Sequence, residues 1–157
     1  MIEDHDGTND VAEHITSFLT FRIARTQNKL NAQITHYLKT QSDISLVDWR
    51  VLRLLDAMGD TTMSQLARLL QMDKGQLSRK IRGLVDRELV RSRVDRVDSR
   101  QQILRIGEAG RALVAEVLPL VQRRQRHLVN GISGEDLETF LDVLSKIDAA
   151  SEHRDPL

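Results

Sequence analysis

The residues most able to do chemistry in this chain are cations, gathered between Lys74 and Arg105. This stretch holds ten lysines and arginines against four acids, a net charge of +6, although the whole chain is formally neutral. A cluster of positive charge in a neutral protein indicates a polyanionic partner. The chain has one Trp, one Tyr and three Phe, so base stacking on single strands is poorly supported and double-stranded DNA is the expected partner.

The first half of the basic stretch has the pattern of two short helices. Thr62 and Gln65 predict the start of a helix that ends near Leu70, and Asp73 and Gln76 predict a second helix that runs to about Arg87. Such a pair is typical of a helix-turn-helix, whose second helix can enter the major groove of DNA. The expected DNA-binding residues of this helix are Lys74, Gln76, Ser78, Arg79 and Arg82. The alternative is that they form only a solvated basic surface.

The second half of the stretch predicts a two-stranded hairpin. Apolar residues at 89–94 and 103–106 flank a turn at 95–100. Arg96 and Arg100 at the tip can reach the minor groove, where negative potential favours arginine. Asp98 allows two interpretations, which can hold together: it orients the guanidinium of Arg100, and it makes turn hydrogen bonds together with Ser99 in a turn that positions this arginine.

Longer helices are expected on both sides of this region. Apolar residues recur at helical spacing over 11–39, Ser45 and Asp48 cap a helix over 46–58 that Gly59 ends, and two more helices follow Gly110 and Ser133. The apolar stripes of the flanking helices cannot all be buried on one small winged helix, which predicts a two-fold dimer. An intramolecular helical bundle is the alternative. We expect flexible tails at 1–10, which is acidic, and at 151–157.

Several classes of function are disfavoured by the composition. The absence of cysteine removes disulfides, zinc-thiolate sites and thiol switches, and the five histidines show no close ligand spacing, so we expect no metal and no cofactor. No apolar run is long enough to span a bilayer, so we expect a cytoplasmic protein with no membrane partner. No nucleophile-and-base pair or phosphate loop is recognisable, so the chain is not expected to be an enzyme.

At the level of motifs, the segment from Leu46 to Gly110 resembles the winged helix-turn-helix of the MarR (multiple-antibiotic-resistance regulator) family of bacterial transcription factors. The most specific match is 98–100, Asp-Ser-Arg, which fits the family's D-x-R element of the wing, and the Leu-Ser-Arg step at 77–79 also fits. The chain departs from the family pattern at Glu88, where glycine is usual, at Gly107, where threonine is usual, and at Ser92, where arginine is common.

The resemblance implies a mainly α fold with a small β-hairpin wing (α+β). Residues 11–150 would form one domain, with the winged helix-turn-helix at 45–107 and dimerisation helices at 11–39 and 108–150. It further implies a homodimeric repressor of a pseudo-palindromic operator, released by a small aromatic or anionic effector. Segments that could line an effector pocket carry His36, Trp49, Arg50 and Arg53, although a single tryptophan on an apolar helix is more often a core residue. The alternatives are a ligand-independent DNA-binding regulator and a winged-helix protein-interaction module.

Overall fold

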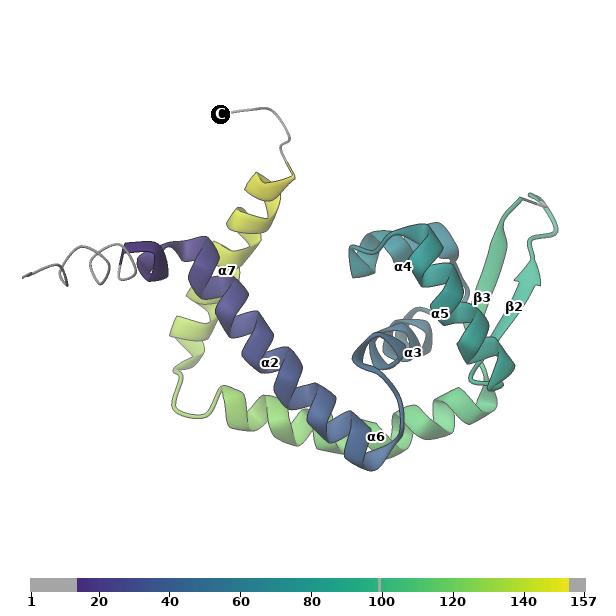
Figure 1. Cartoon of the computed structure of the whole chain (residues 1–157), viewed down its shortest axis with the longest axis horizontal. Helices are drawn as coiled ribbons and strands as arrows, with labels where there is room; N and C mark the ends of the chain where they lie inside the picture. The colour runs from purple at the N-terminus through teal and green to yellow at the C-terminus, as the bar shows by residue number, and fades with distance from the viewer. Residues whose placement is uncertain (1–13, 99, 153–157) are drawn as a thin grey trace, which may run out of the picture. The chain divides into compact units, whose positions relative to one another are not determined.

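The computed structural model describes residues 14–98 and 100–152, and its helices and strands follow the predicted order (Figure 1). The elements are α2 (Leu19–Gln41), α3 (Leu46–Met58), β1 (Thr61–Thr62), α4 (Met63–Leu70), α5 (Lys74–Asp86), β2 (Val90–Val94), β3 (Gln102–Ile106), α6 (Glu108–Leu128) and α7 (Gly134–Ser151). The predicted class, mainly α with a β-hairpin wing, is confirmed. The predictions for the tail at 1–10, for Ser99 and for most of the tail at 151–157 lie outside the described residues.

The chain divides between Val117 and Leu118 into two compact units, which are described separately. The first contains everything from α2 to β3 and the beginning of α6. The second contains the remainder of α6, which includes Pro119 within the helix, and α7. No helix in the described part of the chain is long and apolar enough to cross a membrane.

The predicted helix over 11–39 is interrupted at Phe18. Residues 14–17 are helical, but Phe18 has extended backbone angles (φ −62°, ψ 134°) and α2 starts only at Leu19. The amide of Phe18 donates to the carbonyl of Ile15 (3.2 Å), and the carbonyl of Phe18 accepts from the amide of Arg22 (3.0 Å). Phe18 therefore ends the short helical turn before it and also begins α2. The apolar spacing continues across this break, which is why periodicity alone predicts a single helix.

Helix starts in the winged region follow the predicted caps. Ser45 and Asp48 form a reciprocal capping box at α3, and Thr62 and Gln65 form another at α4. At α5 the carboxylate of Asp73 alone accepts from the backbone amides of residues 75 and 76, at 2.8 and 3.1 Å. These side chains satisfy amides that have no partner within their own helix, so each start is fixed locally.

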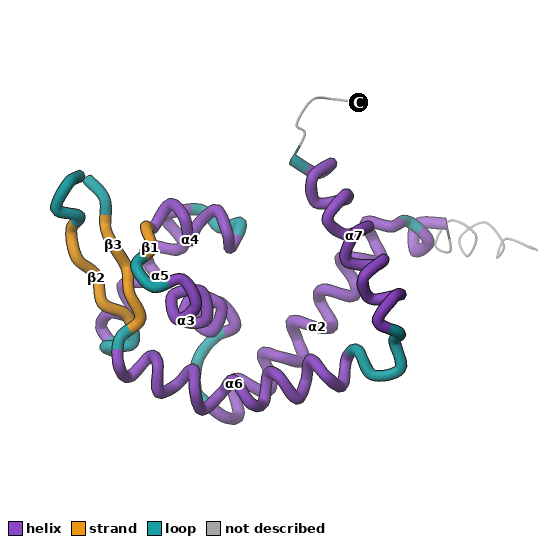
Figure 2. Tube along the Cα trace, turned by 180° about the vertical axis from the view of Figure 1, so that it is seen from behind, coloured by secondary structure: helices purple, strands orange, loops and turns teal. Residues whose placement is uncertain are grey.

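A third strand, which the sequence does not predict, completes the sheet. The strand order is β1-β3-β2, and all pairs are antiparallel (Figure 2). β1 has only two residues, and Thr61 lies opposite Leu104. This short strand attaches the hairpin to the helix-turn-helix, because it leads directly into α4.

The core of the first unit lies among the end of α2, α3, α4, α5, the beginning of α6 and one face of the sheet. Its fully buried side chains are Leu38, Val51, Leu52, Leu55, Thr61, Leu66, Leu77, Leu84, Val90, Leu104 and Val117. Trp49 is also buried, which agrees with its interpretation as a core residue. α5 therefore rests on a packed scaffold and does not depend on its own helix propensity for its position.

Candidate nucleic-acid interface

α5 presents one apolar face to the core and one polar face to solvent. Its Leu77, Ile81 and Leu84 are buried, as predicted. On the other side Lys74, Gln76, Arg79 and Arg82 are exposed, and Ser78 is half-buried. Among the described residues, no acid forms an ion pair with the three cations of this set. The helix thus carries unpaired donors on the face that is free to meet DNA.

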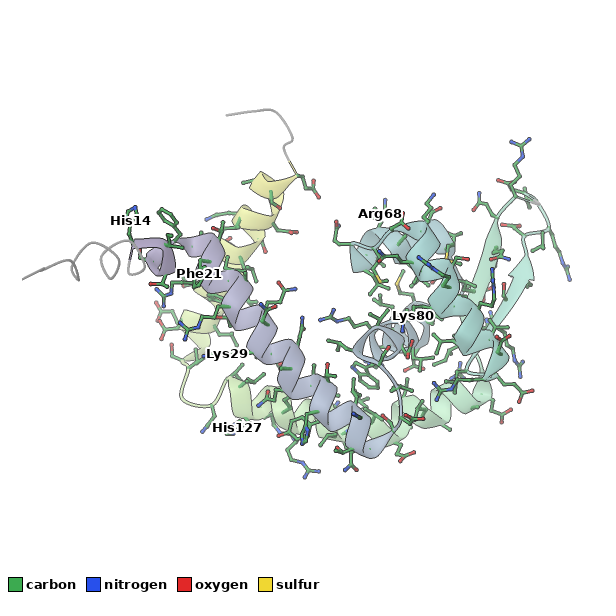
Figure 3. All side chains as sticks on the ribbon, viewed as in Figure 1. His14, Phe21, Lys29, Arg68, Lys80 and His127 are labelled. Atoms are coloured by element: carbon green, nitrogen blue, oxygen red, sulfur yellow. The ribbon has the colours of Figure 1, made fainter. Side chains whose placement is uncertain are left out.

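Lys80 lies on the same helix but has a structural contact. Figure 3 labels Lys80 on α5. The Nζ of this lysine lies 3.9 Å from the Oδ1 of Asp48, a largely buried acid, and 3.5 Å from the Oγ of Ser45. Both partners belong to the capping box of α3. Lys80 therefore joins α5 to the start of α3, and it differs in this respect from Arg79 beside it.

The end of α5 has a Schellman motif built without glycine. The amide of Leu89 donates to the carbonyl of Leu84 (2.9 Å), and the amide of Glu88 donates to that of Val85 (2.9 Å). Glu88 has φ +57°, in the left-handed region where glycine is usual. The departure from the family pattern at this position therefore keeps the backbone geometry of the cap and places a side chain in it.

The tip of the wing is held by two aspartates. The Oδ1 of Asp95 accepts from the amide of Val97 (2.9 Å), and the Oδ1 of Asp98 accepts from the amide of Arg100 (3.0 Å). The Oδ2 of Asp98 accepts from the side-chain amide of Gln101 (3.0 Å). These hydrogen bonds, led by the one from the Arg100 amide, hold the pKa of Asp98 below its ordinary value.

Of the two interpretations of Asp98, the structure supports the turn and not the oriented guanidinium. Within the described part of the chain, its carboxylate meets the backbone of Arg100 and no cationic group. A carboxylate two residues before an arginine is close enough to accept a hydrogen bond from the backbone amide of that arginine, as aspartate side chains do in turns. Arg96 and Arg100 are exposed at the tip, so they are available to a partner.

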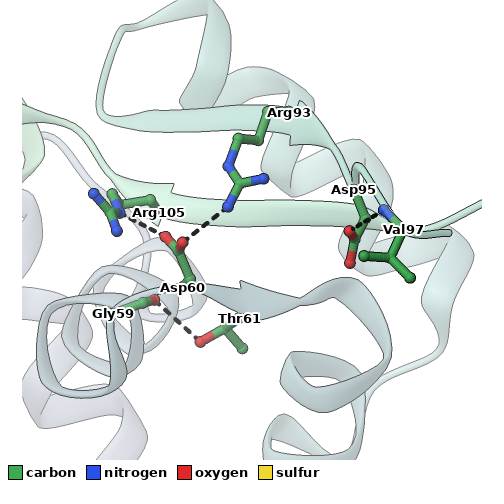
Figure 4. A network of polar contacts seen from close by, with 7 residues as sticks. All are labelled: Gly59, Asp60, Thr61, Arg93, Asp95, Val97 and Arg105. Atoms are coloured by element: carbon green, nitrogen blue, oxygen red, sulfur yellow. Dashed lines mark hydrogen bonds and ion pairs between the residues drawn. The ribbon is translucent and has the colours of Figure 1, made fainter. Parts of the chain in front are cut away.

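Asp60 pairs with two arginines at the base of the wing, a feature that the sequence does not predict. Its Oδ2 lies 3.0 Å from a terminal guanidinium nitrogen of Arg93 on β2, and its Oδ1 lies 2.5 Å from the Nε of Arg105 on β3 (Figure 4). The hydrogen bonds from Arg105 and then Arg93 hold the pKa of Asp60 below its ordinary value. A sequence signal exists: Arg91, Arg93 and Arg105 fall on one face of the predicted hairpin, where three like charges call for an acid.

The structure brings the predicted DNA-binding residues into two groups on the first unit. One group lies along α5 and the other at the tip of the β2–β3 hairpin, and α5 packs against β2 (Figure 1). Contact of these residues with DNA stays a prediction. No group of histidine and acidic side chains that could hold a metal ion occurs in residues 14–98 and 100–152.

Three of the four residues suggested for an effector pocket have ordinary structural contacts: Trp49, Arg50 and Arg53. Trp49 is buried, and a terminal nitrogen of Arg50 donates to the side chain of Asn31 (3.0 Å). Arg53 pairs with Asp56 one turn along α3, at 3.0 Å. These contacts account for the three residues without a bound ligand.

Comparisons with known proteins agree with this geometry. The model of the MarR family matches residues 42–101. Among curated proteins, the HTH-type transcriptional regulator TcaR of Staphylococcus aureus (strain Newman) is 25% identical over 143 residues, which cover 87% of this chain and 93% of TcaR. The chain thus resembles this regulator over nearly its whole length.

Solved structures show the same relationship. A MarR family transcriptional regulator from Silicibacter pomeroyi is 26% identical, with a TM-score of 0.77 over 87% of this chain and 91% of that chain. A MarR mutant from E. coli complexed with operator DNA shares the fold at 22% identity, with a TM-score of 0.76 over 91% and 99%. BpsR of Bordetella bronchiseptica, whose DNA binding is regulated by 6-hydroxynicotinic acid, shares it at 19%, with a TM-score of 0.76 over 85% and 94%.

Proposed function

We propose that the chain is a winged helix-turn-helix transcriptional regulator of the MarR family and that it acts as a homodimeric repressor of a pseudo-palindromic operator. Its relatives and its fold are those of DNA-binding regulators and not of enzymes. The observation that carries the proposal is the unpaired cationic face of α5 beside an exposed, arginine-bearing wing tip.

Each group of residues has a distinct expected role on DNA. Arg79 has the donors to bind a guanine edge, Gln76 can pair with adenine, and Lys74, Ser78 and Arg82 can hold phosphates around the major groove. Arg96 and Arg100 would enter the adjacent minor groove. Asp98 would act indirectly, because it fixes the turn that carries Arg100.

A homodimer is supported by apolar side chains that each unit leaves exposed. In the second unit α7 has no buried residue, although Phe140, Leu141, Val143 and Leu144 lie on it. In the first unit Ile15, Phe18, Leu19 and Phe21 are exposed at and before the start of α2. A second copy can bury these stripes and place two recognition helices about 34 Å apart, one turn of DNA.

The proposed release by a small aromatic or anionic ligand has weaker support. BpsR, which shares the fold, has its DNA binding regulated by 6-hydroxynicotinic acid, a small aromatic acid. We extend that class of effector to this chain, with a ligand-independent regulator as the alternative. A thermal-shift screen of small aromatic acids tests it, because a ligand of the folded state raises the melting temperature and a ligand-independent regulator shows no shift.

Selection from a random duplex pool tests the DNA-binding role. The wild-type chain should enrich a pseudo-palindrome, and Arg79→Ala should weaken binding to the enriched duplex by about tenfold or more, as loss of a bidentate base contact does. Arg100→Ala should weaken it through loss of a minor-groove contact. Lys29→Ala, which removes an exposed cation of α2, is the matched control and should leave affinity unchanged.

The outcomes separate the candidate functions. Full binding by both arginine variants would show that the assigned site is wrong. No binding of any duplex at low salt would favour the protein-interaction module, whose basic face would meet an acidic protein.

A further inference from the structure

We propose that Asp60 is a positioning residue that sets the direction of the wing and thereby restricts tight binding to the cognate DNA sequence. Asp60 touches no predicted DNA contact, so it would act through Arg93 and Arg105. The inference rests on the proposed DNA-binding function and adds a residue that determines specificity from outside the interface.

The contacts of Asp60 join three chain segments at one point. Asp60 lies in the short connection between α3 and β1, and each of its carboxylate oxygens binds an arginine from a different strand of the wing (Figure 4). The connection is itself constrained, because Gly59 has φ +74° and its carbonyl accepts from the hydroxyl of Thr61 (3.2 Å). The carboxylate therefore ties both strands of the hairpin to the end of α3.

Among the residues that the structure describes, no acid other than Asp60 pairs with the two strands of the wing. β1 contributes only two residues to the pairing with β3. Arg91 lies directly opposite Arg105 in the register of β2 and β3, so their charges repel unless an anion lies nearby. By pairing with Arg105 the acid offsets this repulsion, and it holds Arg93 and Arg105 in position, which fixes the base of the hairpin to the end of α3.

Because Asp60 binds an arginine close to the turn, this ion pair can affect the position of the wing tip. Arg93 lies only three residues before Arg96, so its anchorage defines the start of the turn that carries the tip arginines. A small rotation at the base would displace Arg96 and Arg100 from the minor groove while α5 stays in the major groove. Specific binding needs both α5 in the major groove and the tip arginines in the minor groove, whereas non-specific binding needs only positive charge.

Asp60 also lowers the free positive charge of the wing. It neutralises part of the charge on Arg93 and Arg105, whose side chains are still more than half exposed. Removing the acid should thus strengthen binding to random-sequence DNA and weaken binding to the cognate sequence. These opposite signs distinguish a positioning role from a general loss of stability, which weakens both.

The test compares the wild-type chain with Asp60→Asn on two probes: the duplex that wild type enriches from a random pool, and a random-sequence duplex. We expect affinity for the enriched duplex to fall about tenfold, the cost of roughly one mismatched base pair. Affinity for random duplex should rise, with a salt dependence steeper by about one counterion. Hydroxyl-radical footprints should lose protection in the flanking minor groove, while protection of guanine N7 in the major groove from dimethyl sulfate should stay.

Asp56→Asn is the matched control. It removes the same charge from α3, where Asp56 pairs with Arg53 and Arg111 and not with the wing strands, so the ratio of the two affinities should stay at the wild-type value. Arg93→Gln is the second variant in case Asp60→Asn does not fold. It breaks the tie with the opposite change of charge, and it should lower the affinity ratio without strengthening binding to random duplex.

Two results would overturn the inference while the proposed function stands. One is an unchanged affinity ratio in Asp60→Asn when wild type does enrich a sequence, and the other is an equal loss on both probes. If wild type enriches no sequence, the proposed function fails and the inference fails with it.

Discussion

Glu88→Gly should stabilise this protein, although it removes a side chain and adds none. Glu88 occupies the left-handed position of the Schellman motif that ends α5, with φ +57°. A side chain in this conformation places its Cβ close to the neighbouring carbonyl, and glycine avoids that contact. The Glu88 side chain is exposed and takes part in none of the described hydrogen bonds or ion pairs, so its removal should break no contact.

The expected gain follows from two opposing terms. Relief of the left-handed conformation contributes about 1–2 kcal/mol. The greater freedom of glycine in the unfolded chain offsets this by roughly 0.5–1 kcal/mol. The net increase in the free energy of unfolding is about 1 kcal/mol, which corresponds to a rise of about 2–4 °C in the melting temperature of a chain of this size.

Urea denaturation at one fixed protein concentration measures the effect. The midpoint should rise and the slope m should stay unchanged, because the folded state and the exposed surface are the same. The concentration must be held constant, since dimerisation couples stability to it. Glu88→Ala is the control for charge: it removes the same carboxylate but keeps a Cβ at positive φ.

Equal stability of Glu88→Gly and Glu88→Ala would refute this reasoning, because then charge and not backbone conformation decides the effect. A second site tests the same physics with the opposite sign. Gly131 has φ +84°, and no atom lies close to the position that a Cβ would occupy there, so Gly131→Ala should destabilise by about 1 kcal/mol through conformation alone.

Two other glycines give further predictions. A Cβ on Gly110 would overlap the backbone of Leu89, so Gly110→Ala should lower the free energy of unfolding by about 1–3 kcal/mol. Gly134→Ala is the control, because no atom lies close to the position of its Cβ, and it should not lower the free energy of unfolding. Urea denaturation of the two variants measures both effects. Gly83 lies in the interior of α5, one turn after Arg79, with nothing near a Cβ, so Gly83→Ala should stabilise by about 1 kcal/mol. If that face of the helix meets DNA, the same variant should bind the enriched duplex more weakly, and unchanged binding would place Gly83 outside the interface.

Much of this fold follows from local signals in the sequence. The caps at Ser45, Thr62 and Asp73 each depend on residues two or three positions apart, and the structure places helix starts there. The boundaries of α3 are those predicted, because Gly59 ends it as sharply as Ser45 begins it. Local chemistry of this kind can be read from one sequence, because all its participants are neighbours in the chain.

The features that the sequence does not predict depend on residues distant from one another. β1 is too short to give an alternating pattern, and it is a strand only because β3 lies beside it. Asp60 reaches Arg93 and Arg105 across separations of 33 and 45 residues, so nothing in its own neighbourhood marks it as the partner of the wing. The preference of Asp98 for a backbone amide over a guanidinium is decided by the path of the turn.

Two departures from the family pattern that are far apart in the sequence belong to one contact in the structure. A Cβ on Gly107 would overlap the carbonyl oxygen of Glu88, and the amide of Gly107 donates to the carbonyl of Leu89 at 2.8 Å. Glycine at 107 therefore admits the backbone that ends the recognition helix, while glutamate at 88 keeps the left-handed turn that brings this backbone there. Threonine at 107 would supply a hydroxyl cap to α6, but a residue larger than glycine has no room at this position. Replacing Gly107 alone by the usual threonine should consequently destabilise the chain, because its Cβ would overlap this backbone, whereas Glu88→Gly keeps the left-handed turn and leaves the contact unchanged.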